Sequence, residues 1–181
     1  PLKFMGYDIP GNKNTLKNVQ RNLLMTDYII TPNSHTSHVF LNRYKLRGIY
    51  QGTILEAGYP RNDILQERDS SIIASLKAEG VSVDSRKIVL YTPTWKGTSI
   101  TNPVGNVEQI VAEVDYLQTR HPEVQVLVKV HPYTYHIAVS NQKLKKILIP
   151  DYFDANRVLS VTDILITDYS SIFFDFEITK R

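Results

Sequence analysis

The chain has 181 residues, of which 42% are hydrophobic and 10% aromatic, enough apolar material for one packed domain or for parts of two. Its formal charge is only +3 and the basic residues are scattered along the sequence, which gives little support for nucleic-acid binding. Because cysteine is absent, disulfides, thiolate nucleophiles and zinc–thiolate sites are excluded, a composition that fits a reducing cytosol. No apolar run is long enough to cross a bilayer.

The first third of the chain predicts strands alternating with helices. The expected elements are a helix over 14–25, a strand over 27–31, a helix over 35–44 and a strand over 54–58. Ser34 resembles an N-cap for the second of these helices. The turn-rich sequence 58–63 then separates this part from the remainder.

The remainder shows a more regular alternation. The expected elements are a helix over 69–79 that ends at Gly80, a strand over 88–91, a loop through 105, a helix over 107–119, a strand over 124–130, a mostly helical stretch over 133–146, a short strand over 147–149, a helix over 151–159 and a final strand before 168. Strands separated by helices of this length predict an α/β fold, a Rossmann-like parallel sheet flanked by helices with right-handed crossovers.

The most informative segment is 164–175, where an apolar strand pattern breaks into small hydroxyl residues and then resumes at helical spacing. Amide hydrogens in the first turn of a helix lack intrahelical partners and attract anions, so Ser170 and Ser171 are candidates for holding a phosphate. The alternative is that Asp168 or Ser170 only caps the helix.

Two further apolar runs end in residues suited to chemistry. In the segment 124–132, Lys129 and His131 follow the strand, and Pro132 restricts His131 to extended geometry. An imidazole held there could donate a hydrogen bond to a phosphate or act as an acid or base, whereas the simpler interpretation is a histidine bonded to a backbone carbonyl beside a solvated lysine.

Thr92, Thr94 and Trp95 follow the strand over 88–91, where hydroxyls could hold phosphate oxygens and the indole could pack on a base. Trp95 could equally belong to a core. Arg61 offers a fork-shaped donor for a phosphate or for a carboxylate salt bridge, and Asp175 could receive a ribose or polyol hydroxyl or simply face solvent. Because ligands of open α/β sheets bind beyond the carboxyl ends of the strands, we expect these residues to converge on one crevice.

Motifs of other nucleotide and hydrolase sites are missing. The sequence has no Gly-x-Gly-x-x-Gly after a strand, no Walker lysine motif, no Gly-x-Ser-x-Gly elbow and no convincing set of metal ligands.

Five segments in order resemble the CDP-glycerol glycerophosphotransferases of wall teichoic acid synthesis. They are Pro-Leu-Lys-Phe-Met-Gly at 1–6, Gly-Tyr-Pro-Arg-Asn-Asp at 58–63, Tyr-Thr-Pro-Thr-Trp at 91–95, Lys-Val-His-Pro at 129–132 and Thr-Asp-Tyr-Ser-Ser-Ile-Phe-Phe-Asp at 167–175. The resemblance implies a GT-B architecture of two Rossmann-like domains. Residues 1–60 are then expected to be the end of an N-terminal acceptor-side domain with its linker, and 61–181 a C-terminal nucleotide-binding domain that is incomplete at its C-terminus.

The resemblance also implies an activity. It is the metal-independent transfer of glycerol phosphate, or ribitol phosphate in close relatives, from CDP-glycerol or CDP-ribitol to a hydroxyl of a lipid-linked teichoic acid acceptor, with no cofactor. The expected location is the cytoplasm, peripherally at the inner face of the membrane, and membrane contact rests on analogy alone. The alternatives are a nucleotide-sugar glycosyltransferase or epimerase on the same scaffold, and a nucleotide-binding fragment without catalysis.

Carried over by position, His131 matches a functional histidine beside the donor phosphates, and Ser170 and Ser171 match the loop that holds the pyrophosphate. Arg61 and Lys129 are expected to add positive charge. In the family a His-Gly-Thr segment, with the proposed catalytic base, precedes the position of Pro1, so the chain is expected to be a fragment that is inactive alone.

Overall fold

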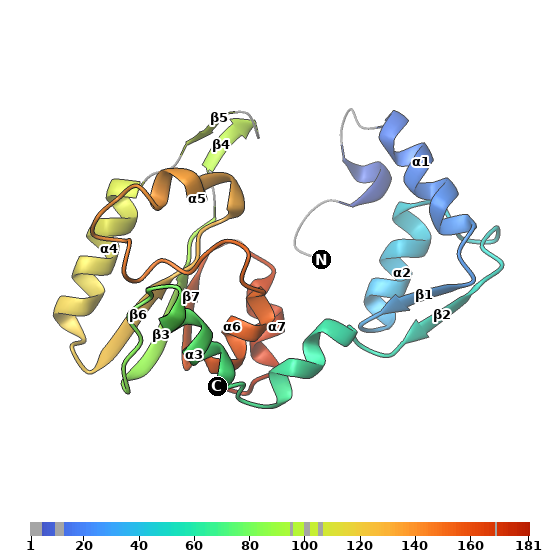
Figure 1. The fold of residues 1–181 in the computed structure, drawn as a ribbon. Helices are drawn as coiled ribbons and strands as arrows, with labels where there is room; N and C mark the ends of the chain where they lie inside the picture. Colours follow the sequence, from blue (N-terminus) through green and yellow to red (C-terminus); the bar gives the residue numbers. More distant parts are fainter. Residues whose placement is uncertain (1–4, 10–12, 95, 100–101, 105–106, 169) are drawn as a thin grey trace. The chain divides into compact units, whose positions relative to one another are not determined.

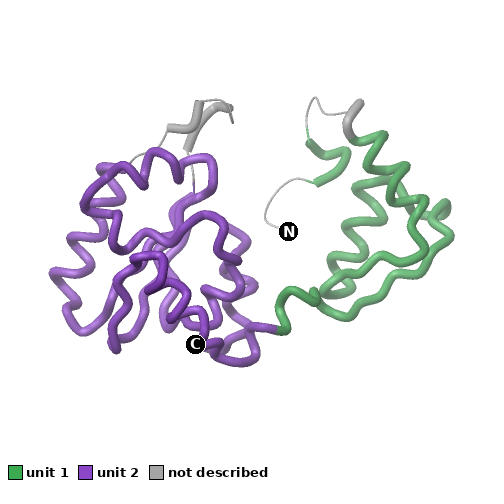
Figure 2. The backbone as a smooth tube through the Cα atoms, viewed as in Figure 1, with its two compact units in different colours: residues 1–63 green, residues 64–181 purple. Residues whose placement is uncertain are grey.

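The computed structural model describes residues 5–9, 13–94, 96–99, 102–104, 107–168 and 170–181. Contacts divide the chain into two compact units, unit 1 over 1–63 and unit 2 over 64–181 (Figure 2). The division falls inside a 3-10 helix, η2, at Pro60–Gln66.

Unit 1 contains a small parallel sheet. Its elements are the 3-10 helix η1 (Gly6–Asp8), α1 (Lys13–Leu24), β1 (Tyr28–Thr31), α2 (Ser34–Arg43) and β2 (Thr53–Glu56). β1 and β2 pair in parallel, with Tyr28 opposite Thr53 and Thr31 opposite Glu56. The expected strand–helix–strand order is therefore present in this unit.

The cap of α2 differs by one residue from the prediction. Asn33 is the N-cap, and its side-chain oxygen accepts a hydrogen bond from the amide of Thr36 at 2.9 Å, whereas Ser34 is the first helical residue. Asparagine and serine are about equally good N-caps, so the sequence alone does not choose between two adjacent candidates.

Unit 2 is built around a central parallel sheet (Figure 1). Its elements are α3 (Ser71–Ala78), β3 (Lys87–Thr92), β4 (Lys96–Ser99), β5 (Asn102–Val104), α4 (Val107–Arg120), β6 (Val124–Val128), α5 (Pro132–Ala138), α6 (Ala155–Val161), β7 (Ile164–Thr167) and α7 (Ile172–Glu177). The strands lie in the order β6, β3, β7, and Leu148 adds one parallel bridge outside β6. Numbered along the chain, β3 is first, β6 second, Leu148 third and β7 fourth. Their spatial order across the sheet is therefore 3-2-1-4, the order of a doubly wound fold. The predicted α/β class is confirmed.

Helices cover both faces of this sheet. On one side, the α4 face, Val114 of α4 and Ala138 of α5 pack on Val89 and Val126. On the other side, the α6 face, residues of α3, α6 and α7 pack on Leu90 and other alternate strand residues. Successive side chains of a strand point to opposite faces, so a sheet with both faces covered needs apolar residues in succession. All five residues of β6 are buried.

Four segments depart from the sequence-based expectation. The short strand expected over 147–149 is reduced to a single parallel bridge at Leu148. The stretch expected as a loop before 105 contains the antiparallel hairpin β4–β5. The helix expected over 133–146 ends at Ala138, since the Asn141 side chain accepts the amide hydrogen of Lys143 at 3.0 Å and holds a turn. The helix expected from 151 begins at Ala155, because the Asp154 side chain caps it through the amide of Arg157 at 3.0 Å.

The end of α3 follows the prediction. Gly80 has φ of +82°, a left-handed conformation that favours glycine, and the next amide, that of Val81, reaches back to the Leu76 carbonyl at 3.0 Å. Within the described residues, every helix is too short or too polar to cross a membrane.

Candidate functional site

The strand order of unit 2 reverses between β3 and β7. From β3 the chain proceeds to β6 on one side, and it later returns to β7 on the other side. In doubly wound folds ligands bind beyond the carboxyl ends of the strands at such a reversal. Thr92 and Thr167 are opposite each other in register, so the residues just after them form a common rim at this reversal.

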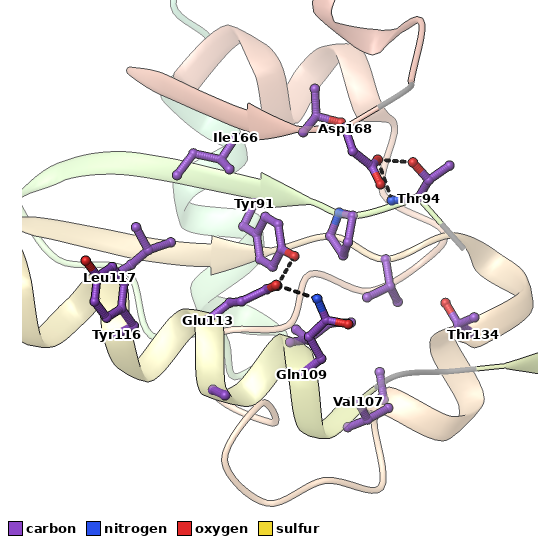
Figure 3. A pocket seen from close by; sticks show the side chains of 16 residues that line it. Tyr91, Thr94, Val107, Gln109, Glu113, Tyr116, Leu117, Thr134, Ile166 and Asp168 are labelled. Carbon is purple, nitrogen blue, oxygen red and sulfur yellow. Dashed lines mark hydrogen bonds between the residues drawn. The ribbon is translucent and has the colours of Figure 1, made fainter. Parts of the chain in front are cut away.

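Side chains extend the pairing of β3 and β7 past the last ladder position. The Thr167 hydroxyl donates to the Thr92 carbonyl at 2.8 Å. The Asp168 carboxylate accepts hydrogen bonds from the Thr94 amide, at 2.8 Å, and from the Thr94 hydroxyl (Figure 3). We call this second pair the Thr94–Asp168 clasp. It joins two residues that the sequence predicted to bind substrate, and it fixes the loop after β3 against the loop after β7.

Thr92, also predicted to bind substrate, lies below the rim. It is only 7% exposed, and its hydroxyl oxygen has no hydrogen-bond partner among the described residues. Its neighbours Leu90 and Tyr91 pack against the α6-face and α4-face cores respectively, so Thr92 points to the α6 face.

Lys129 is half-buried on the α6 face. Its ammonium group donates to the carbonyl oxygens of Pro150 at 3.2 Å and of Asp151 at 3.3 Å. Burial lowers the pKa of Lys129, and attraction to Asp151 and Asp154 opposes this shift only in part. The side chain thus ties the end of β6 to the segment before α6, and it is not the solvated lysine of the simpler interpretation.

His131 is the N-cap of α5. Its Nδ1 accepts a hydrogen bond from the Tyr133 amide at 3.3 Å, and the two rings lie 4.5 Å apart. With Nδ1 acting as acceptor, the neutral imidazole carries its proton on Nε2. The ring is therefore oriented by its own helix, and Nε2 is the nitrogen suited to donate to an anion.

The serine loop after β7 ends at a short helix. Ser171 is the N-cap of α7 without a side-chain capping bond, while the Ser170 hydroxyl lies 3.5 Å from the Ile172 amide, which donates to it. The Ser170 amide donates to the Asp168 carbonyl at 2.6 Å. Asp175 lies within α7 rather than on the rim.

Two predicted residues are not among the described residues of unit 2. Arg61 belongs to unit 1, where its guanidinium lies 4.1 Å from the centre of the Tyr59 ring. Trp95 lies outside the described residues. The parallel sheet therefore brings Thr92, Thr94, Lys129, His131, Asp168, Ser170 and Ser171 to one edge of unit 2.

A cavity of about 630 Å³ opens beside this edge, on the α4 face (Figure 3). Thr94 and Asp168 line it together with Tyr91 of β3 and Glu113 of α4. The sequence did not single out Glu113, because a glutamate in an amphipathic helix is ordinarily solvated. A second cavity lies in unit 1 on α2, beside His35 and His38. Among the described residues, no group of three histidine, aspartate or glutamate side chains is arranged to hold a metal ion.

Comparison with known proteins gives a family match over the whole chain. Residues 1–181 match the model described as CDP-glycerol:poly(glycerophosphate) glycerophosphotransferase. The teichoic acid poly(glycerol phosphate) polymerase of Bacillus spizizenii is 30% identical over 100% of this chain and 48% of its own length. The teichoic acid ribitol-phosphate polymerase TarK of Staphylococcus aureus is 27% identical over 74% of this chain and 27% of its own length.

Solved structures of the wall teichoic acid polymerase TagF are also similar. One variant has 27% identity and a TM-score of 0.76, over 100% of this chain and 46% of that one. The same variant soaked with CDPG has 26% identity and a TM-score of 0.69, over 98% of this chain and 42% of that one. The chain thus spans about half the length of the first relatives it matches.

Proposed function

The chain belongs to the CDP-glycerol:poly(glycerophosphate) glycerophosphotransferase family, and from this premise we propose that it is the donor-binding part of a teichoic acid glycerophosphotransferase. The observation that carries the proposal is the common edge where β3, β6 and β7 end, at the strand reversal that binds nucleotides in such folds. Unit 2 is then the nucleotide-binding Rossmann-like domain of a GT-B enzyme, and unit 1 is the end of the acceptor-side domain.

The donor substrate is CDP-glycerol, whose diphosphate needs hydrogen-bond donors and positive charge around it. Ser170 and Ser171 offer hydroxyls beside the amides at the start of α7, and His131 offers Nε2–H. Lys129 contributes charge from below the edge, since its ammonium is already bonded to carbonyls. Such groups stabilise a phosphoryl transition state by position and charge, and the proposal includes no metal.

In the reaction, an acceptor hydroxyl attacks the phosphorus that carries the glycerol. A new bond forms between the acceptor oxygen and this phosphorus, the bond from phosphorus to the bridging oxygen breaks, and CMP leaves. A general base outside unit 2 takes the acceptor proton. His131 donates a hydrogen bond to the phosphate oxygens and neutralises charge that develops on the leaving group.

The acceptor is the hydroxyl of a lipid-linked teichoic acid chain. An acceptor of this kind places the enzyme in the cytoplasm, peripherally at the inner face of the membrane. Ribitol phosphate is the second candidate group, because a ribitol-phosphate polymerase is also similar to the chain. A panel of CDP-glycerol, CDP-ribitol and UDP-sugars as donors for the full-length protein separates these readings from a nucleotide-sugar glycosyltransferase.

The proposed role of His131 is tested by measuring glycerol phosphate transfer and CDP-glycerol binding with the full-length protein. We expect His131→Ala to lower the transfer rate by about 100-fold to 10,000-fold, the usual range for a group that handles protons or charge in the transition state. Ser170→Ala should weaken CDP-glycerol binding in calorimetry. The matched control is His121→Ala, at an exposed residue just before β6, which should leave both quantities unchanged. Undiminished binding and transfer in both the His131 and Ser170 variants would overturn the proposal.

A further inference from the structure

The net positive charge of the chain belongs to unit 1. Residues 1–63 contain eight lysine and arginine residues against four aspartate and glutamate residues, a net charge of +4, whereas residues 64–181 carry a net charge of −1. From 28 to 55 the sequence has no acidic residue, but it has Arg43, Lys45 and Arg47. Such a difference in charge between two parts of one chain indicates that the basic part meets an anionic partner.

The cavity on α2 lies within this basic stretch. Its volume is about 660 Å³, which is within the usual range of small-molecule pockets. The lining includes His35, His38, Asn42 and Arg43. These positions are separated by three, four or eight residues, which places their side chains on one flank of the helix. Among the described residues that line the cavity none is acidic, so its lining suits an anion.

Arg47 orders two of these lining side chains. Its Nε donates to the side-chain oxygen of Asn42 at 3.0 Å, and its Nη2 donates to Nε2 of His38 at 3.0 Å. A guanidinium has donors only, so His38 accepts at Nε2, and the neutral imidazole carries its proton on Nδ1. Both of these partners are neutral and leave the positive charge of Arg47 in place.

Arg43 supplies a second cation, and η1 holds it in position. The Nε atom of Arg43 lies 2.8 Å from a carboxylate oxygen of Asp8 in η1. The carbonyl oxygen of Arg43 leaves no room for a β-carbon at Gly6, so the backbone of η1 packs directly on the end of α2. Because Asp8 balances part of the charge of Arg43, Arg47 is the stronger attractor for an anion at this face.

We propose, on the basis of the proposed function, that this face of α2 binds a phosphodiester group of the acceptor chain. A poly(glycerol phosphate) acceptor carries one negative charge on each linking phosphate, and this charge complements that of unit 1. The guanidinium of Arg47 can donate two parallel hydrogen bonds to one phosphate, and Nδ1–H of His38 adds a third donor. The site holds the acceptor by its backbone, at a distance from the hydroxyl that reacts.

The surface of α2 favours a polymer over a lipid bilayer. Helices that lie on membranes present an exposed apolar face beside a basic one. The structure describes all residues of α2, and its apolar side chains Val39, Phe40 and Leu41 are each partly buried, with none of them exposed. The helix therefore offers hydrogen bonds and charge but no apolar face for insertion.

The site is tested by measuring the binding of short poly(glycerol phosphate) chains to the full-length protein and its Arg47→Ala variant. We expect the affinity to fall by about threefold to tenfold, because a forked guanidinium–phosphate pair is stronger than an ordinary exposed ion pair. The slope of log affinity against log salt concentration should decrease by about 1, as for the loss of one phosphate contact in a nucleic-acid complex.

Two further variants separate a specific contact from a general loss of charge. Arg21→Ala is the matched control, since it removes the same charge from an exposed residue of α1 outside the cavity, and it should leave the affinity for the chain nearly unchanged. Arg47→Lys should keep the salt dependence and lose part of the affinity, because an ammonium group lacks the fork. Equal affinities in Arg47→Ala and Arg21→Ala would overturn the inference.

The outcomes also separate this inference from the proposed function. If the unaltered protein binds neither CDP-glycerol nor the chain, both fail. If it binds CDP-glycerol and Arg47→Ala has no effect on chain binding, only the inference fails. Vesicles that contain phosphatidylglycerol distinguish a lipid headgroup from the acceptor. Weaker vesicle binding in Arg47→Ala, with chain binding unchanged, would assign this face to the membrane and overturn the inference.

Discussion

The two parallel sheets of the chain differ in how completely other elements cover them. In unit 2 the β3–β6–β7 sheet has helices on both faces and fully buried residues such as Leu90 and Val126. In unit 1 the β1–β2 sheet leaves Tyr28 65% and Ile30 45% exposed within the described part of that unit. A rim that must hold side chains to within fractions of an ångström needs a close-packed support, and among the described residues only the unit 2 sheet has one on both sides.

We expect the difference between the two sheets to have its largest effect on stability, when a core residue is truncated. We expect Leu90→Ala, at a residue with 0% exposure, to lower the free energy of unfolding by about 2–5 kcal/mol, because the lost contacts leave a cavity. Ile30→Ala, at the exposed face of β1, should change it by only about 0.5 kcal/mol. Urea unfolding of both variants measures the difference. Equal losses at the two sites would show that the unit 1 sheet is buried in the intact protein.

Breaking an ion pair should also destabilise unit 2 more than unit 1, by a smaller amount. The Asp163 carboxylate accepts hydrogen bonds from Arg68 at 2.7 Å and from the Ile88 amide at 2.8 Å, at the start of β3. Asp163→Asn should therefore cost about 1–3 kcal/mol at neutral pH. Asp8→Asn, which breaks a partly exposed pair with Arg43 in unit 1, should cost at most about 1 kcal/mol.

The Asp163 bonds also give a pH dependence with a definite sign. Burial by itself raises the pKa of Asp163, but the bonds from Arg68 and Ile88 outweigh it, and the net pKa is lowered. A carboxyl whose pKa is lower in the folded state stabilises the protein above its unfolded pKa, and this contribution is lost as the pH falls through the folded value. The stability difference between the protein and Asp163→Asn should thus shrink below about pH 4. A difference that stays constant down to pH 2 would contradict this account.

The smallest effect concerns the ends of the strands. Asp168→Ala removes the clasp to Thr94 and should raise the KM for CDP-glycerol by about threefold to tenfold, with kcat less affected, since a displaced loop weakens donor binding. Asp168→Asn keeps an oxygen that can accept from the Thr94 amide and should restore most of the affinity. In unit 1, Thr31→Val breaks a buried bond to Ser37 and should lower stability without changing KM. A KM effect in Asp168→Asn as large as in Asp168→Ala would mean that Asp168 binds the donor through its charge.

The parallel sheet could be predicted from the sequence better than the contacts of the site. Consecutive apolar residues in β6 and the alternation with helices were visible directly, because burial on both faces leaves a strong pattern. The hairpin β4–β5 was missed, since its short strands have no such pattern. The Thr94–Asp168 clasp and the bonds between Tyr91 and Glu113 join residues far apart in the chain, and no local signal records such pairs. The carbonyl partners of Lys129 were hidden for the same reason.

The central claim is that the donor binds where β3, β6 and β7 end. The most direct measurement is a structure of the full-length protein with CDP bound. We expect diphosphate oxygens about 3 Å from hydrogen-bond donors of Ser170, Ser171 or His131. A nucleotide held by other residues alone, such as those beside His35 and His38 on α2, would contradict it.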